Sequence, residues 1–277
     1  MKKIIAAFDG LKYSESTAAY AIEMAKKYNG KIFGIFLEDF TYHSYSIADL
    51  GREDFPELRA AHLNTIDVEM RENAIKHFTK QCEEEGLIYS IHRDRNIALR
   101  ELLHESRFAD MIVIQNNETL THYSETAPSN FIADLLDKSE CPVLVVPPIF
   151  EKIEKIIFLY DGEPSSVFAI KQFAYLLQGQ QKMPVELLCA KEKDKTSRIP
   201  EAFYLREWLQ LYYNDVKYSV IVGDADKAIL TFLKEQTRNC LVVLGAYERS
   251  SISRMIHHSL ADTIIKSIDM PLFISHR

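Results

Sequence analysis

Short apolar runs alternate with amphipathic stretches along the whole chain. In the first half, apolar runs of strand length fall at 3–8, 32–37, 88–92, 111–114 and 143–146. Apolar positions recur at helical spacing after the first run, and longer helical patterns fall at 56–85, 97–106 and 130–138. The strands are apolar almost throughout, which is typical of a parallel sheet covered on both faces. Strict alternation of strand and helix therefore predicts a doubly wound α/β fold with right-handed crossovers.

The chain also repeats itself. The segment KIIAAFDGLKYSESTAAYAIEMA, from Lys3, returns as KIIFLYDGEPSSVFAIKQFAYLL, from Lys155. A later match pairs CPVL, from Cys141, with MPLF, from Met270. The repeat predicts two domains, 1–148 and 149–277, and the first carries an insertion at about 38–60.

Composition narrows the class of protein. The chain has 277 residues, 47% hydrophobic and 26% charged, as in ordinary globular proteins. Its net charge is −7 and no basic patch dominates, so nucleic acid is not an expected partner. The four cysteines lack the spacing of a metal cluster or disulfide framework, and three of them, in or beside apolar runs, are expected to be buried thiols. No run has the roughly 20 apolar residues of a membrane span, and Asp9 comes too soon for a signal peptide, so a cytoplasmic protein is expected.

The order of short motifs resembles the universal stress protein family over nearly the whole chain. DGLKYSEST and DGEPSSVFA open the two halves, VGDADKAIL lies in the second, and CPVLVV closes the first. The resemblance implies two tandem Rossmann-like domains of the adenine nucleotide alpha hydrolase type. Each would have a five-stranded parallel sheet flanked by helices. It also implies a stress-linked protein from a family in which some members bind ATP and others do not.

Family members that bind ATP have a loop of the form Gly-x2-Gly-x9-Gly-(Ser/Thr) after the fourth strand. Glycines let backbone N–H groups approach phosphate oxygens, and the next helix attracts negative charge. By resemblance, the second half would bind a nucleotide through Asp161, Ala190, Leu244, Gly245 and Ser259. Only Asp9 and Ser129 correspond in the first half, where Gln115 and Pro128 replace glycines. ATP with Mg²⁺ is therefore the candidate cofactor of the second domain, and no catalytic residue or protein metal site is predicted.

Glutamates at two loop positions bear on this expectation. Glu118 and Glu248 stand where the family loop has its second glycine. A carboxylate about 4 Å from a phosphate costs roughly 1 to 4 kcal/mol per charge pair, depending on the local dielectric. A bound Mg²⁺ would relieve this repulsion. Alternatively, both are carboxylates at the start of a helix, stabilised by its dipole.

These observations predict a stress factor that binds a ligand or a protein partner and has degenerate nucleotide loops. The alternatives are an ATP switch with ATP or AMP in the second domain, and a binding protein for another small molecule above the strand ends. At most weak ATP hydrolysis is expected. The closing strands, 142–146 and 271–275, are expected to pair within the chain as a pseudo-dimer, because a free sheet edge is a hazard. A homodimer through the tyrosine-rich insertion is a further alternative.

Overall fold

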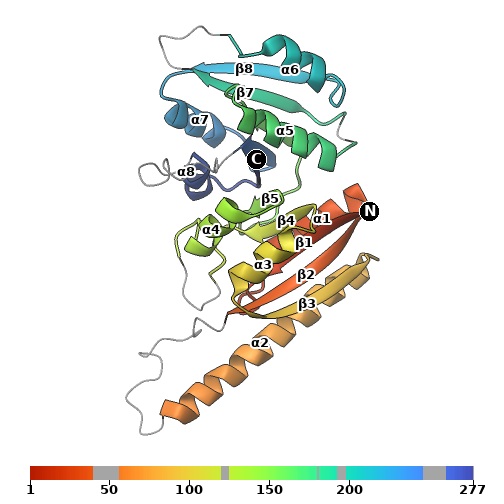
Figure 1. The fold of residues 1–277 in the computed structure, drawn as a ribbon, viewed down its shortest axis with the longest axis vertical. Coiled ribbons are helices and arrows are strands. Elements are labelled where there is room, and N and C mark those ends of the chain that lie inside the picture. Colours follow the sequence, from red (N-terminus) through yellow and green to blue (C-terminus); the bar gives the residue numbers. More distant parts are fainter. Residues whose placement is uncertain (40–55, 120–124, 180, 192–197, 246–259, 277) are drawn as a thin grey trace. The chain divides into compact units, whose positions relative to one another are not determined.

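We describe the chain from a computed structural model, which places residues 1–39, 56–119, 125–179, 181–191, 198–245 and 260–276 (Figure 1). The chain divides into two compact units, Met1–Cys141 and Pro142–Arg277. Each unit is described by itself.

The first unit is a parallel sheet with the strand order β3-β2-β1-β4. Its elements in chain order are β1 (Lys2–Phe8), α1 (Glu15–Tyr28), β2 (Gly30–Asp39), α2 (Pro56–Glu84), β3 (Tyr89–Asn96), α3 (Ala98–Ser106), β4 (Met111–Gln115) and α4 (Asn130–Lys138). Residues 4–8 of the central strand β1 are all buried, as an apolar run between two neighbouring strands and two helical layers requires.

Helix α1 shows how local sequence sets an element. The hydroxyl of Ser14 caps its start by accepting a hydrogen bond from the Thr17 backbone N–H at 3.0 Å. Asn29 ends it in the left-handed conformation, with φ of 53°, which asparagine tolerates better than most residues. The helix buries an alanine-rich face that includes Ala18 and Ala21 against the sheet, so it lies close to β1.

The second unit contains a six-stranded sheet in the order β5-β10-β9-β6-β7-β8. Its elements are β5 (Val143–Val146), β6 (Lys155–Leu159), α5 (Pro164–Leu176), β7 (Val185–Lys191), α6 (Ala202–Leu209), β8 (Val216–Val222), α7 (Ala225–Lys234), β9 (Cys240–Gly245), α8 (Leu260–Ser267) and β10 (Leu272–Ser275). All neighbours are parallel except β5 and β10, which pair antiparallel with Val145 opposite Leu272.

The pairing of β5 with β10 confirms that the two closing strands of the repeats meet. β5 ends the first repeat in the sequence, yet it belongs to the second compact unit because of this pairing. Every residue of both strands is buried, in keeping with their apolar side chains.

The two units differ most in the helix that follows their second strand. α2 has 29 residues, whereas α6, at the same place in the second repeat, has 8. The expected insertion at 38–60 falls largely outside the described residues, which resume at Pro56 with the first turn of α2. The extra length of the first repeat is therefore seen in part as a longer helix.

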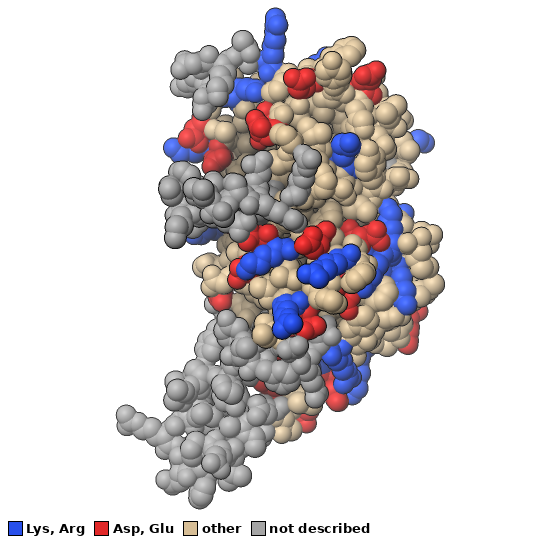
Figure 2. Space-filling model, in the orientation of Figure 1, with Lys and Arg blue, Asp and Glu red and all other residues tan. Residues whose placement is uncertain are grey.

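The doubly wound α/β fold predicted from the sequence is confirmed in both units. All four cysteines are buried and free, and burial raises the pKa of Cys141 to about 12, which keeps its thiol protonated. None of the helices, as far as the described residues extend, has the length and hydrophobicity to cross a membrane. On the face shown in Figure 2, the described Lys and Arg side chains are interspersed with Asp and Glu and do not gather into one basic patch.

Candidate functional site

Three of the predicted ligand residues of the second unit meet at one edge of its sheet. Asp161 follows β6, Ala190 lies near the end of β7 and Gly245 ends β9. The strands run parallel in the order β9-β6-β7, so their carboxyl ends reach the same edge. In open α/β sheets this edge is where ligands bind, and here it lies beside the start of α5.

The Asp161 carboxylate organises the turn from β6 into α5. Its Oδ1 accepts hydrogen bonds from the Glu163 backbone N–H at 2.8 Å and from the Ser166 hydroxyl at 2.7 Å. The Glu163 carbonyl oxygen lies 2.9 Å from the same hydroxyl and is the alternative acceptor of its single proton. Asp161 is nevertheless exposed to solvent, so a ligand at this edge would reach it.

Gly245 lies against the first turn of α5. A Cβ on this residue would come within 2.5 Å of the Ser165 carbonyl oxygen and 2.9 Å of the Ser166 nitrogen. Real Cβ atoms essentially never approach backbone so closely, so the packing of this site is by itself enough to require glycine. The glycine that suggested a phosphate loop therefore also has a structural reason.

The remaining predicted residues of the second unit are less informative. The Leu244 side chain is 2% exposed and packs in the core, which leaves only its backbone for a ligand. Ala190 is half-buried. Ser259, together with Glu248, falls outside the described residues, so the predicted loop is described only at its start.

In the first unit, the aspartate at the equivalent edge is buried. Asp9 follows β1 and is 1% exposed. Its Oδ1 accepts hydrogen bonds from the backbone N–H groups of Leu11 at 2.9 Å and Lys12 at 2.8 Å. Burial, which outweighs these hydrogen bonds, raises the pKa of Asp9 above its ordinary value.

Glu118 is buried beside Asp9. The residue is 4% exposed, and burial together with the negative charge of Asp9 raises the pKa of Glu118 well above its ordinary value. Two carboxyl groups that share one buried space do not both ionise readily, so the pair retains a proton at a higher pH than an exposed carboxyl does. Glu118 is not itself helical, and within the described residues the next helix, α4, begins at Asn130, so the structure does not support the interpretation of Glu118 as a helix-start carboxylate.

Hydrogen bonds also hold the two described ends of the first loop, 115–119 and 125–129. Ser129 caps α4 by accepting from the Ile132 N–H at 3.2 Å, and its hydroxyl donates to the Glu118 carbonyl oxygen. The Ser14 hydroxyl, at the start of α1, donates to Gln115 Oε1 at 2.6 Å. Ser129 is fully buried, so its hydroxyl closes the loop and is not presented to a phosphate.

The two edges thus have opposite character. In the first unit, Glu118 and Gln115 occupy the space above the strand ends and bond to the unit's own groups. In the second unit, Gly245 carries no side chain and Asp161 is open to solvent. Among the described residues, no group of three or more His, Cys, Asp or Glu side chains is arranged to hold a metal ion.

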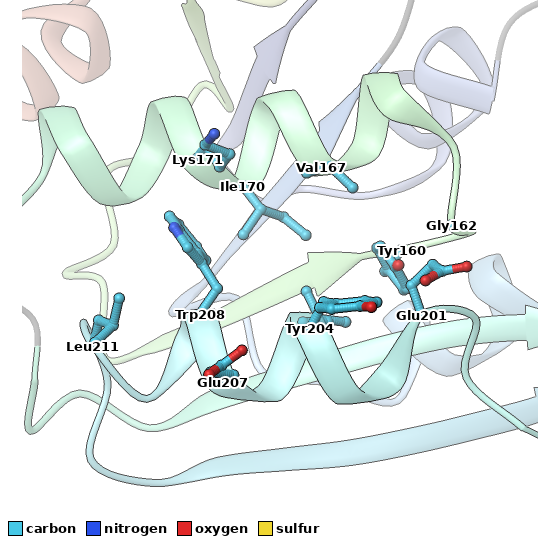
Figure 3. Close-up of a pocket in the computed structure, with 11 residues that line it drawn as sticks. Tyr160, Gly162, Val167, Ile170, Lys171, Glu201, Tyr204, Glu207, Trp208 and Leu211 are labelled. Atoms are coloured by element: carbon cyan, nitrogen blue, oxygen red, sulfur yellow. The ribbon is translucent and has the colours of Figure 1, made fainter.

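The structure also shows a feature that the sequence analysis missed. A pocket of about 520 Å³ lies between α5 and α6 of the second unit, and Trp208, the chain's single tryptophan, lines it (Figure 3). The available signal was the concentration of aromatic residues between 203 and 213, FYLREWLQLYY. Helical spacing alone does not tell whether the aromatic face of a helix packs against a neighbouring element or lines an open pocket.

Comparison with known proteins agrees with this architecture. No family model matches the chain. Universal stress protein Slr1230 of Synechocystis sp. is 20% identical, and the match covers 98% of this chain and 99% of that protein. A universal stress protein from Archaeoglobus fulgidus has a similar structure, with a TM-score of 0.68, 15% identity and coverage of 99% and 98%.

A third match is the Pseudomonas aeruginosa protein PA1789, of unknown function. It has a TM-score of 0.63, 14% identity and coverage of all of this chain and 92% of that one. The fold is thus that of two-unit, Rossmann-like α/β proteins. The resemblance to universal stress proteins that the sequence motifs indicated is confirmed over the full length of the chain.

Proposed function

We propose that this chain is a cytoplasmic, non-catalytic stress-response protein that binds a small ligand at the carboxyl edge of its second unit. The observation that carries the proposal is the contrast between two equivalent aspartates. Asp161 is exposed at an open edge, whereas Asp9 is 1% exposed beneath Glu118. The first unit, whose equivalent edge is filled by its own side chains, would then have a structural role.

Electrostatics supports the assignment of roles. A phosphate near Asp9 and Glu118 would face carboxyl groups in a buried, low-dielectric space, where each unneutralised charge pair costs several kcal/mol at an effective dielectric near 20. At the second edge, the start of α5 lies beside Gly245 and offers the positive end of a helix dipole. We therefore assign adenine nucleotide, with Mg²⁺ as counter-ion, as the first candidate ligand there.

A second candidate is a small molecule without phosphate. Glu163 lies exposed beside Asp161, so the described part of the edge carries two carboxylates that weaken the binding of an anion that brings no Mg²⁺ with it. The Ser166 hydroxyl bonds to Asp161 but is 5% exposed, and we infer that ATP, where bound, is held and not turned over. The pairing of β5 with β10 also occupies sheet edges that a second chain would otherwise use.

Calorimetry on the full-length chain tests the proposal. ATP with Mg²⁺, AMP and adenosine would be titrated into the wild type, Asp161→Asn and Asp9→Asn. We expect one site per chain, with affinity reduced at least tenfold in Asp161→Asn and unchanged in Asp9→Asn. A site that survives Asp161→Asn but is lost in Asp9→Asn would overturn the proposal, as would phosphate release above that of a protein-free control.

Mass spectrometry of molecules released from freshly purified protein separates the two candidates. Recovered ATP or AMP at near one per chain supports a nucleotide ligand. Recovery of another small molecule, displaced in proportion by the Asp161→Asn substitution, supports the second candidate.

A further inference from the structure

The pocket between α5 and α6 has the dimensions of a ligand site. Its volume is about 520 Å³, within the roughly 300 to 1,000 Å³ typical of small-molecule pockets. Val167 and Ile170 point into it from α5, and Tyr204 and Trp208 face them from α6 (Figure 3). The pocket therefore has an apolar floor and aromatic walls.

This pocket is separate from the ligand edge proposed above. Asp161, Ala190 and Gly245 are not among the residues that line it. Only Tyr160 and Gly162, the neighbours of Asp161 in the chain, reach its end. The inference that follows does not rest on the proposed function.

The first unit shows that this fold does not require such a pocket. There the long helix α2 packs over the equivalent region, around Phe8, the counterpart of Tyr160. Phe78 of α2 packs on Phe8 with ring centroids 5.3 Å apart. In the second unit the shorter α6 leaves the corresponding space open.

The charges around the pocket are unequal. Two glutamates, Glu201 and Glu207, line it together with one lysine, Lys171. Neither glutamate forms an ion pair within the described part of the chain. Both glutamates are exposed, and the excess of negative over positive side chains around the pocket favours an occupant with a positive charge.

Glu201 stands at a special backbone position. Its φ of 47° and ψ of 27° lie in the left-handed region, which is costly for a residue other than glycine. The residue immediately precedes α6 and lies at the same end of the pocket as Tyr160 and Tyr204 (Figure 3). A carboxylate beside aromatic rings is a combination that favours an organic cation.

We propose that this pocket binds a small molecule with an apolar, ring-containing body and one positively charged amine. The body lies between Ile170 and Trp208, and the amine lies at the end formed by Glu201, Tyr160 and Tyr204. Burial of the body supplies most of the affinity, and the carboxylate gives the preference for a cation.

Trp208 makes the proposal directly measurable, because it is the only tryptophan of the chain and lines the pocket. Three matched probes, 4-phenylbutylamine, 4-phenylbutanol and 4-phenylbutyrate, would be titrated into the full-length protein while tryptophan fluorescence is followed. We expect saturable binding of the amine, at least tenfold tighter than that of the carboxylate, with the alcohol between them.

Two variants locate the site and its charge preference. Glu201→Gln is expected to reduce the amine's advantage over the carboxylate to less than threefold, and Val167→Phe, which places a bulkier side chain in the pocket, to weaken the binding of all three probes. Glu235→Gln, an exposed change beyond the end of α7, is the control and leaves all three affinities unchanged. Circular dichroism would confirm that each variant is folded.

Three outcomes would overturn the proposal. One is a fluorescence response that does not saturate, and another is a carboxylate that binds as tightly as the amine. The third is a protein that sediments as a dimer and becomes monomeric in Trp208→Ala, since a second copy of the chain would then cover this face.

Discussion

Gly245 and Ser165 lie so close together that a Cβ on the glycine would be 2.5 Å from the serine carbonyl oxygen. The contact joins the end of β9 to the first turn of α5, the two elements that frame the candidate ligand edge. It fixes the position of the α5 helix start relative to the sheet, so a change at Gly245 would alter both the stability of the unit and the geometry of the proposed ligand edge.

Gly245→Ala is therefore expected to destabilise the second unit. The added methyl group has no room against backbone, and overpacking of this kind typically costs about 1 to 3 kcal/mol. Urea denaturation followed by Trp208 fluorescence reports on this unit specifically, because the tryptophan lies in it.

Gly179→Ala, in the same unit, is the comparison for that experiment. A Cβ there meets nothing within 4 Å, and only the φ of +89° opposes the substitution, so a loss of about 1 kcal/mol is expected. A Gly245→Ala protein as stable as the wild type would mean that α5 moves freely relative to β9.

The stability of the first unit should decrease as the pH rises above the ordinary range of carboxyl pKa values. The folded state holds the Asp9–Glu118 pair with raised pKa values, so it binds more protons than the unfolded state between about pH 4.3, the ordinary glutamate value, and the raised values. The stabilisation by the protonated pair is fully present below about pH 4.3, and it is lost as the pH rises from there through the raised pKa values.

Glu118→Gln is expected to remove much of this pH dependence and to raise the free energy of unfolding at pH 8 by about 1 kcal/mol or more. Hydrogen exchange of β1 and β4 amides at pH 5.5 and pH 8 would measure it. Glu72→Gln, an exposed change on α2, is the matched control and should leave the pH dependence as in the wild type. Equal pH dependence in Glu118→Gln and wild type would contradict the prediction.

How much of this was visible in the sequence depends on the range of the interactions involved. The strand and helix pattern is local, and helix α4 was predicted at its observed bounds, Asn130–Lys138. The pairing of β5 with β10 followed from the repeat and from the hazard of a free edge. Both inferences needed only periodicity, burial and the order of segments.

The details of the sites were not visible, because they depend on the direction of single side chains. Nothing in the spacing of QNNET indicates that Glu118 turns inward to Asp9, since that depends on how the whole loop up to Ser129 closes. The open pocket depends on a helix of 8 residues leaving a groove that a helix of 29 residues covers. Periodicity gives the length of a helix but not how well it covers its neighbour.

Glu186 is expected to stabilise the second unit at neutral pH. It is 1% exposed on β7, and its carboxylate contacts Lys155 Nζ at 2.7 Å, Lys217 Nζ at 2.9 Å and the Ser219 hydroxyl at 2.5 Å. Burial alone would raise its pKa, but hydrogen bonds from Lys155, Ser219 and Lys217 outweigh burial and lower the pKa to about 2. The stabilisation is present above the ordinary glutamate pKa and is lost as the pH falls toward 2.

Glu186→Gln should then cost about 2 kcal/mol at pH 7, a value that allows for the solvent exposure of Lys217, and much less at pH 3. Denaturation with urea at the two pH values measures the difference. Glu235→Gln should show no such dependence. A loss of the same size at both pH values would mean that the carboxylate charge is not what stabilises the strand.

A charge in the middle of the β5–β10 pair tests the seam between the closing strands. Val145 is 1% exposed and lies opposite Leu272, so Val145→Asp would bury a carboxylate with no partner among the apolar residues of the two strands. We expect a loss of more than about 4 kcal/mol in the second unit. β5 should separate from β10, which leaves the apolar edge of β10 free. Self-association should follow, because such an edge pairs with other chains.

Val222→Asp is the matched control, since Val222 ends β8 and is 51% exposed, and it should cost less than about 1 kcal/mol. Thermal unfolding followed by Trp208 fluorescence, together with sedimentation velocity, measures both effects. Unchanged stability and a monomeric Val145→Asp protein would show that β5 does not pair with β10 in solution.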